Sequence, residues 1–333
     1  MTRVRAFTPG RVNLIGDHTD TTGGLVLPMA IHLGTRVAVE RRGIDVRLRS
    51  TTEDEPAAIP IEVADPGSVS PAWGRYVAGV VAELRPTVGA VGTVHTTLPV
   101  GAGLSSSAAL EVSVALALGF TGSHVELALA CQRAEHAASG VPSGIMDQLT
   151  SAAGVAGSAL LIDCTTLERT PVPLPPGVEV VVVHSGEARE LVGSAYGERR
   201  RQCEAAEAEI GPLRTATLDA VAAIGDPVVQ RRARHVVTEN ARVREAAAAL
   251  AAGDAETAGR AMAASHASLR DDFEVSTPAL DRLVAELSAA PGVFGARLTG
   301  AGFGGCAVAL TRPGAVRRGW VVRAVGGASV AAV

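Results

Sequence analysis

A segment rich in glycine and serine, residues 99–109, holds the side chains and backbone best suited to bind a phosphate. It reads Pro-Val-Gly-Ala-Gly-Leu-Ser-Ser-Ser-Ala-Ala, and it lies between a stretch of strand composition (91–98) and an apolar stretch (108–120) typical of a helix. Glycines let the backbone bend or approach a ligand, and a helix N-terminus favours an anion. The segment therefore indicates a polyphosphate site or, with about even weight, a serine-capped helix after a tight turn.

A second group of reactive side chains lies near the N-terminus, around Gly16. Asp17, His18 and Asp20 fall within four residues of one another. This spacing matches no standard metal motif, whereas carboxylates accept hydrogen bonds from neighbouring hydroxyl groups. The group could hold a metal, clamp a polyol or lie on a solvated turn, and composition alone favours the solvated turn.

Two common phosphate-binding arrangements are excluded. The chain contains no lysine, so all 30 basic residues are arginine and the Gly-Lys-Ser/Thr of a Walker A loop cannot follow the 99–109 segment. The His-Arg-Asp and Asp-Phe-Gly motifs of protein kinases are also absent.

Length and composition indicate a globular, cytoplasmic protein. The 333 residues, 47% hydrophobic and 19% charged, suffice for about two domains. A net charge of −4 gives no basic footprint for nucleic acid, and neither a signal-peptide core nor an apolar run of bilayer length is present. Four scattered cysteines fit a reducing compartment better than a disulfide framework or a zinc site. We therefore expect neither a nucleic acid nor a membrane as partner.

Hydrophobic patterning predicts an irregular mixture of strands and helices around these segments. Strands are expected at 4–7, 25–31, 35–41, 46–50, 91–98, 160–163, 178–183 and 306–310. Helices are expected at 73–84, 108–120, 124–139, 194–209, 227–252, 254–270 and 277–289, the third opened by a capping box at Ser123. Segments 35–41 and 46–50 are expected to pair as a hairpin through Arg42-Gly43. The order is too irregular for a doubly wound fold, which leaves α/β or α+β with mixed sheets.

A proline-rich stretch predicts the domain boundary. Four prolines fall within residues 171–177 and break the chain. We expect an N-terminal domain at 1–170, which carries both reactive segments, and a C-terminal domain at 171–333.

Several stretches together resemble one family. The 99–109 segment meets every fixed position of the pattern Pro-x-Gly-x-Gly-Leu-x-Ser-Ser-Ala, the phosphate loop of the GHMP kinases, and residues 10–20 with 24–31 resemble the galactokinase signature. Further similar stretches are 132–136 with 144–148, 191–196 with 199–203, 265–274, and 297–306. The resemblance covers nearly the whole chain.

The resemblance implies a fold and a reaction. The fold is a two-domain, α+β GHMP-kinase-like fold with mixed sheets and the active site between the domains. The reaction is the ATP- and Mg²⁺-dependent phosphorylation of the anomeric hydroxyl of a sugar, D-galactose to galactose 1-phosphate. A small sugar and ATP are the implied partners, and a monomer is expected.

The same resemblance implies roles for individual residues. Asp147 matches the catalytic aspartate, thought to take the proton of the anomeric hydroxyl, and Arg11 matches an arginine beside it and the γ-phosphate. Ser107 and Glu135 match Mg²⁺ ligands. Sugar-contacting positions are Asp17, His18, Asp20, Gly144 and Tyr196, and nucleotide-binding positions are Gly101, Gly103, Leu104, Ser105, Ser106 and Ser107. Residues 300–305 match a third motif beside the phosphates. Taken alone, each of these residues has a plain structural explanation, such as capping, core packing or a surface charge.

Two departures concern the sugar. Galactokinases usually have glutamate where this chain has Asp17, and tyrosine where it has Thr21. Both changes would open space at the C6 end of the sugar. One alternative is thus an anomeric kinase for a larger, C6-extended or phosphorylated sugar of the heptose or octose type. A second alternative is a catalytically silent, galactokinase-like sugar sensor, against which the intact serine run and Asp147 argue.

Overall fold

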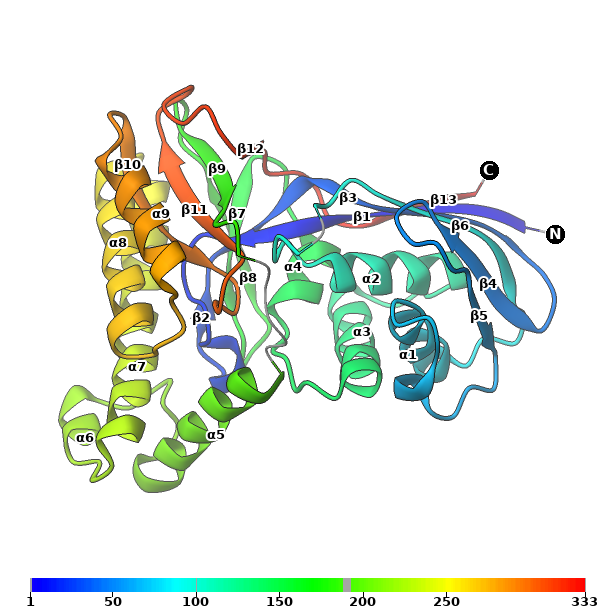
Figure 1. Ribbon diagram of the computed structural model, residues 1–333, viewed down its shortest axis with the longest axis horizontal. Coiled ribbons are helices and arrows are strands. Elements are labelled where there is room, and N and C mark those ends of the chain that lie inside the picture. The colour runs from blue at the N-terminus through cyan, green and yellow to red at the C-terminus, as the bar shows by residue number, and fades with distance from the viewer. Residues whose placement is uncertain (1, 100, 188–192, 333) are drawn as a thin grey trace.

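Three β-sheets and the helices packed on them form an elongated molecule (Figure 1), seen here in a computed structural model. The structure describes residues 2–99, 101–187 and 193–332. Val100, Leu191 and Val192, which belong to stretches quoted above, lie outside the described residues.

The first sheet has six strands in the order β13-β1-β3-β6-β4-β5. Their bounds are β1 Thr2–Asn13, β3 Pro28–Arg41, β4 Asp45–Ser50, β5 Ala57–Pro60, β6 Ala90–Thr96 and β13 Ser329–Ala332. The pairs are antiparallel except for β4 with β6. Since β13 pairs with β1, the C-terminal end of the chain returns to the sheet that begins at the N-terminus.

The hairpin expected between 35–41 and 46–50 is wrong. β6 lies between β3 and β4 and pairs with both. Glycines permit this close approach, because a Cβ at Gly89 would meet the backbone oxygen of Asp45 at 2.2 Å and one at Gly92 would meet that of Ala38 at 2.0 Å. A distant strand therefore displaces the local pairing.

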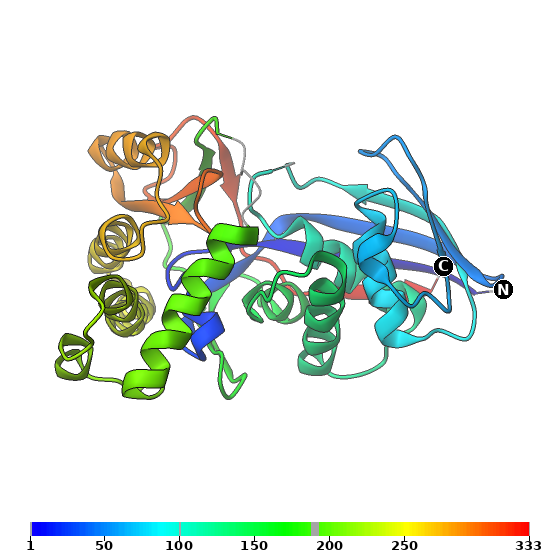
Figure 2. The ribbon, with the colours of Figure 1, turned by 60° about the horizontal axis from the view of Figure 1, so that its bottom comes forward.

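Four helices cover one face of the first sheet (Figures 1 and 2). They are α1 Gly74–Leu84, α2 Ser106–Leu118, α3 His124–Ser139 and α4 Met146–Ala153. The predicted capping box is confirmed, because the Ser123 hydroxyl accepts a hydrogen bond from the Glu126 N–H (3.2 Å) and the Glu126 carboxylate accepts one from the Ser123 N–H (2.7 Å).

The second half of the chain builds a four-stranded antiparallel sheet and a group of helices. The sheet has the order β10-β11-β9-β12, with β9 Glu179–His184, β10 Val293–Thr299, β11 Cys306–Thr311 and β12 Trp320–Val322. The helices are α5 Gly193–Ile210, α6 Leu218–Ala222, α7 Pro227–Ala251, α8 Ala255–Asp271 and α9 Pro278–Ala289. A small sheet of β2 Leu25–Val26, β7 Ser158–Asp163 and β8 Arg169–Pro173 lies beside them. The expected α+β class with mixed sheets is confirmed.

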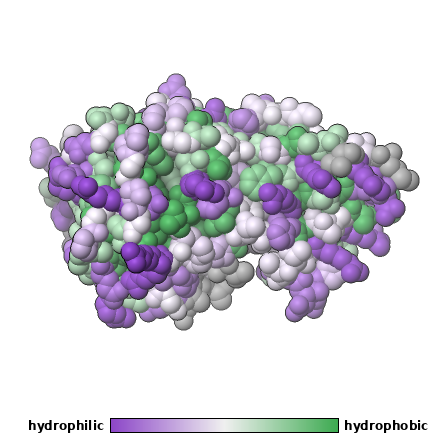
Figure 3. All heavy atoms as spheres, turned by 90° about the horizontal axis from the view of Figure 1, so that it is seen from above, coloured by the Kyte–Doolittle hydropathy of each residue, from purple (hydrophilic) through white to green (hydrophobic). Residues whose placement is uncertain are grey.

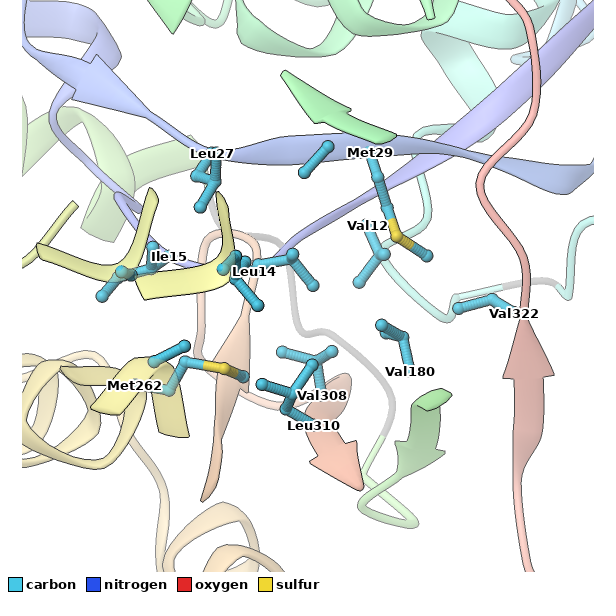
Figure 4. Close-up of a cluster of buried hydrophobic side chains, with 14 of the residues drawn as sticks. Val12, Leu14, Ile15, Leu27, Met29, Val180, Met262, Val308, Leu310 and Val322 are labelled. Atoms are coloured by element: carbon cyan, nitrogen blue, oxygen red, sulfur yellow. The ribbon is translucent and has the colours of Figure 1, made fainter. Parts of the chain in front are cut away.

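One hydrophobic core joins the two halves of the chain (Figure 4). Val12 and Met29 come from the first sheet, whereas Val180, Met262 and Val308 come from the second half, and all five are buried in the same cluster. The segments on either side of residue 170 are therefore packed together rather than tethered.

Hydrophilic residues extend along the whole length of the face seen in Figure 3. Within the described ranges, no helix combines the length and the apolar composition that crossing a bilayer requires.

Candidate active site

A pocket of about 870 Å³ opens between the two halves of the molecule. Ser107 and Asp147 line it from the first half, and Tyr196 and Gly300 line it from the second. Every site residue expected from the sequence lines this pocket except Leu104. The Leu104 side chain is buried in the hydrophobic core, and only its backbone oxygen takes part, accepting a hydrogen bond from the Arg11 N–H at 3.2 Å.

A paired Arg11 and Asp147 form the centre of the pocket. Arg11 donates from Nε to Asp147 Oδ1 (2.7 Å) and from Nη2 to Oδ2 (2.6 Å). Its remaining Nη1 donates to the Gly103 backbone oxygen (2.7 Å). The Ser105 hydroxyl also donates to Asp147 Oδ2 (2.6 Å). Two-point pairing fixes the plane of the carboxylate as well as its position.

The local backbone explains why Arg11 reaches Asp147. The register of β1 against β3 shifts between Pro9 and Arg11, which marks a bulge. A Cβ at Gly10 would meet the Leu104 backbone oxygen at 2.5 Å, so glycine is needed for the 99–109 segment to rest on β1. Asp147 lies in the first turn of α4. The two side chains, 136 residues apart in sequence, meet because a sheet and a helix N-terminus converge there.

The 99–109 segment ends in an exposed helix N-terminus. Gly101 and Gly103 adopt positive φ angles of 73° and 70°, and the N-cap residue Ser105 is also left-handed, with φ 59°. Ser106 and Ser107 form the first turn of α2 and face the pocket. Helix geometry leaves the first N–H groups without partners in the helix, so this turn can bind an anion.

Oxygen atoms suited to a hard cation lie beside that turn. The Ser107 hydroxyl donates to Glu135 Oε1 (2.9 Å), and Glu135 Oε2 accepts from the Ser143 hydroxyl (2.8 Å) and from Gln148 Nε2 (2.8 Å). A hydroxyl and a carboxylate fit Mg²⁺, which prefers oxygen and takes further ligands from water and phosphate. Among the residues that the structure describes, no cluster of three or more His, Cys, Asp or Glu could hold a metal.

The sequence analysis did not predict a functional role for Glu111, a buried acid behind Glu135. Glu111 of α2 has no exposed surface, and its Oε2 accepts from Gln148 Nε2 at 3.1 Å. Burial, with the neighbouring Glu135 carboxylate, raises the pKa of Glu111 well above its ordinary value. The signal was present, because a lone acid interrupts the apolar run 108–118. Gln148 thus links the pocket carboxylate to a buried acid.

Residues 16–25 include the predicted sugar-contacting positions Asp17, His18 and Asp20, and we call them the sugar segment. This segment is held against the second half of the chain. Asp17 Oδ1 accepts from the Gly300 N–H (3.1 Å), and Asp17 Oδ2 lies 2.5 Å from an Arg297 nitrogen. Burial raises the pKa of Asp17, and the Arg297 guanidinium opposes this rise. His18 has a positive φ of 67°, and its Nε2 lies 3.1 Å from the Ala301 backbone oxygen. Asp17 therefore makes protein contacts in addition to lining the pocket.

Asp20 lies opposite Gly144 in a strongly negative environment. Removal from water raises the pKa of Asp20 to about 7, and the Asp147 and Asp17 carboxylates add to the rise. A Cβ at Gly144 would lie 1.9 Å from Asp20 Oδ2, so the loop before α4 touches this carboxylate. The Tyr196 ring lies 5.6 Å from that of His18, and burial raises the pKa of its hydroxyl well above the ordinary value. Tyr196 is therefore a neutral donor at this end of the pocket.

Two aromatic residues at the other end of the pocket were predicted only as part of the helix 73–84. Trp73 and Tyr76, at the start of α1, line the wall beyond the 99–109 segment. Aromatic residues make up only 3% of the chain, so two within four positions were an available signal. This wall supplies flat apolar surface beside the anion-binding turn.

The chain matches protein-family models along most of its length. Residues 2–41 match the galactokinase galactose-binding signature, 75–155 match the N-terminal domain of GHMP kinases, and 246–320 match their C-terminal region.

Related proteins and solved structures indicate the same family. The human galactokinase is 46% identical over 323 residues, which span 91% of this chain and 82% of that protein, and the Roseiflexus galactokinase is 46% identical over 92% and 83%. Among solved structures, the Lactococcus lactis galactokinase complexed with galactose has a TM-score of 0.90 at 32% identity and covers 98% of this chain and 95% of that one. A mevalonate kinase, 19% identical with a TM-score of 0.70, shares the fold.

Proposed function

The chain belongs to the galactokinase family of GHMP kinases, and from that membership we propose that it transfers the γ-phosphoryl group of ATP to the anomeric hydroxyl of D-galactose. The products are galactose 1-phosphate and ADP. The observation that carries the proposal is the two-point Arg11–Asp147 pair, which lies between the sugar segment and the anion-binding turn of α2.

We assign Asp147 the role of accepting the proton of the anomeric hydroxyl. The bond from the sugar oxygen to the γ-phosphorus forms as the bond from that phosphorus to the leaving ADP oxygen breaks, and the proton passes to an Asp147 oxygen. Arg11 holds the carboxylate through Nε and Nη2 and places a positive charge where the phosphoryl group carries negative charge. Positioning and electrostatics then supply most of the acceleration.

We assign the nucleotide to the part of the pocket along α2 and α1. The phosphates fit the N-terminal turn of α2 with Gly101 and Gly103, and the base fits the aromatic wall of Trp73 and Tyr76. Ser107 and Glu135 would hold Mg²⁺. When bound, this ion neutralises charge on the phosphates.

We assign the sugar to the opposite end of the pocket. Asp20 offers acceptors for hydroxyl groups, and His18 and Tyr196 form the wall behind it. Asp17 lies at the side of Arg297 and Gly300, so its carboxylate also ties the sugar segment to the loop 300–305. We further propose that the halves 1–170 and 171–333 are the two domains and that the protein works as a cytoplasmic monomer, whose mass light scattering would measure.

A coupled assay of ADP release across a panel of sugars tests the proposal. We expect galactose to be used with kcat/KM of about 10⁴ M⁻¹s⁻¹ or more. Preference for C6-extended sugars would contradict galactose as the substrate. Binding of galactose and ATP without ADP release would contradict catalysis altogether and indicate a sensor.

A further inference from the structure

Helix α7 presents three buried polar side chains to the sugar segment. His235 and Glu239 lie four residues apart on the same face of the helix, and Asn240 follows Glu239 directly. At most 2% of each side chain is exposed. None of the three lines the pocket. Their polar atoms must therefore serve the protein rather than a ligand in the pocket.

Each of these side chains bonds the backbone of the sugar segment. Glu239 Oε1 accepts from the Gly16 N–H at 3.0 Å, and Asn240 Oδ1 accepts from the Leu25 N–H at 2.8 Å. His235 Nε2 lies 3.1 Å from the Asp17 backbone oxygen, which only accepts, so this nitrogen carries the proton. Both ends of the segment are thus bonded to one helix.

Glu239 is a buried carboxylate with several partners. Its Oε1 also accepts from the Ser265 hydroxyl (2.5 Å), and its Oε2 accepts from Arg242 Nε (2.7 Å). Burial opposes its ionisation, but the nearby His235 and Arg242 outweigh this effect and lower the pKa of Glu239. A buried charge is costly unless it is paired and hydrogen-bonded, as it is here.

The sugar segment packs closely against α7. Gly16 has a φ of +99°, and a Cβ there would come within 2.9 Å of a Val243 methyl group on α7. A Cβ at Gly24 would come within 2.7 Å of Asn240 Oδ1. The two glycines let the backbone lie directly on the helix.

We propose that Glu239, with His235 and Asn240, positions the sugar segment, so that α7 sets the binding of galactose without touching it. Residues between the bonded positions 16, 17 and 25 include His18 and Asp20, which face the pocket. The inference rests on the proposed function only for the identity of the sugar. A displaced segment weakens sugar binding and leaves the nucleotide end of the pocket intact.

Glu239→Gln tests this with little change of shape. The glutamine side chain has one oxygen and one NH₂ group in place of two carboxylate oxygens. Its NH₂ group must face either the Gly16 N–H or the Arg242 Nε–H, and both of these are donors. We expect the KM for galactose to rise about tenfold or more, while kcat and the KM for ATP change by about twofold or less. The matched control is Glu245→Gln on the exposed side of the same helix, which should change neither KM. An equal rise in both KM values, or no rise in the KM for galactose, would overturn the proposal.

Hydrogen exchange gives a second readout that needs no substrate. The amide of Gly16 should exchange about tenfold faster in Glu239→Gln, and that of Leu25 should do so in Asn240→Ala, with Glu245→Gln unchanged. Unchanged exchange at both amides would overturn the proposal. If the parent protein failed to phosphorylate galactose, the proposed function would be wrong. Hydrogen exchange at Gly16 and Leu25 would still decide whether α7 holds the sugar segment.

Discussion

Asp147 has its carboxylate bonded on several sides before any substrate binds. Arg11 takes both oxygens, and Ser105 donates to one of them. Its side chain is 28% exposed, whereas that of Arg11 is 5% exposed. A group that faces the pocket yet cannot rotate suits a reaction in which positioning matters more than covalent chemistry.

Asp147→Asn should abolish most turnover and preserve binding. The amide keeps the shape of the side chain but loses its charge and its ability to accept a proton, so we expect kcat to fall by about 10²–10⁴. Calorimetric titration with galactose and ATP should give near-parental affinities. A variant with parental kcat would remove Asp147 from the mechanism.

Asp20, at the end of the pocket that we assign to the sugar, has a pKa close to neutral pH. Its raised pKa of about 7 follows from burial and from the Asp147 and Asp17 carboxylates. Only the ionised form offers charged acceptors to sugar hydroxyls. Sugar affinity should therefore depend on pH near neutrality.

We expect the KM for galactose to fall as pH rises from 6 to 8, and to be flat over this range in Asp20→Asn.

The buried Asp20 carboxyl should also make the stability of the protein decrease as pH rises. Between pH 4 and 7 the folded state holds a proton at Asp20 that the unfolded state has lost, so the free energy of unfolding falls as pH rises and levels off above 7. Urea unfolding of the parent protein and of Asp20→Asn measures this effect. The free energy of unfolding of Asp20→Asn relative to the parent should increase from pH 4 to pH 7. A difference that stays constant over this range would contradict the raised pKa of Asp20.

Helices α2 and α3 together form the proposed cation site. Ser107 from α2 and Glu135 from α3 are bonded to each other, so neither helix alone carries the site. Ser107→Ala and Glu135→Ala each remove one oxygen, and each should raise the Mg²⁺ concentration for half-maximal activity. Mn²⁺·ATP binding followed by electron paramagnetic resonance gives a second measurement. Ser288→Ala on the exposed side of α9, which does not line this pocket, is the control. Unchanged titrations in both site variants would place the cation elsewhere.

The loop before α4 closes the sugar end because it carries a glycine. A methyl group at Gly144 would collide with Asp20 Oδ2 at 1.9 Å and push this carboxylate from its place. We expect Gly144→Ala to raise the KM for galactose about tenfold or more. Gly225→Ala, where a Cβ meets nothing within 4 Å, should behave as the parent. Equal kinetics of the two variants would show that this contact does not matter.

At the scale of the whole molecule, the two halves share a core and a sheet. Val12 and Val308 are buried in one cluster, and β13 completes the sheet begun by β1. A chain of this length often unfolds in stages when its domains have separate cores. Each half also has buried clusters of its own, but the shared cluster couples the unfolding of the two halves.

Thermal unfolding should therefore show one cooperative transition. We expect a single calorimetric peak with equal calorimetric and van't Hoff enthalpies. Galactose and a nucleotide analogue, which bind between the halves in our proposal, should raise Tm without splitting the peak. Two resolved transitions would show that the segments before and after residue 170 are stable separately.

Local sequence determined the elements whose signals lie within a few residues. The capping box at Ser123 opens α3, and the cap and proline at Thr277-Pro278 open α9, where the Thr277 hydroxyl accepts from the Leu280 N–H. The apolar run 178–183 is the buried strand β9 with a one-residue shift. These features depend on backbone geometry over one turn or one strand, which neighbouring residues fix.

Only the tertiary structure decided which residues meet. The family resemblance implied that Arg11 lies beside Asp147, but the two-point geometry of this contact across 136 residues comes from the folded chain. Nothing in the sequence predicted the bond from Gly16 to Glu239, which spans 223 residues. The insertion of β6 between β3 and β4, likewise, overrode a plausible local hairpin. Spacing along the chain carries no information on such partners, because hydrogen-bond groups and buried charges are satisfied by whichever distant segment the packing brings beside them.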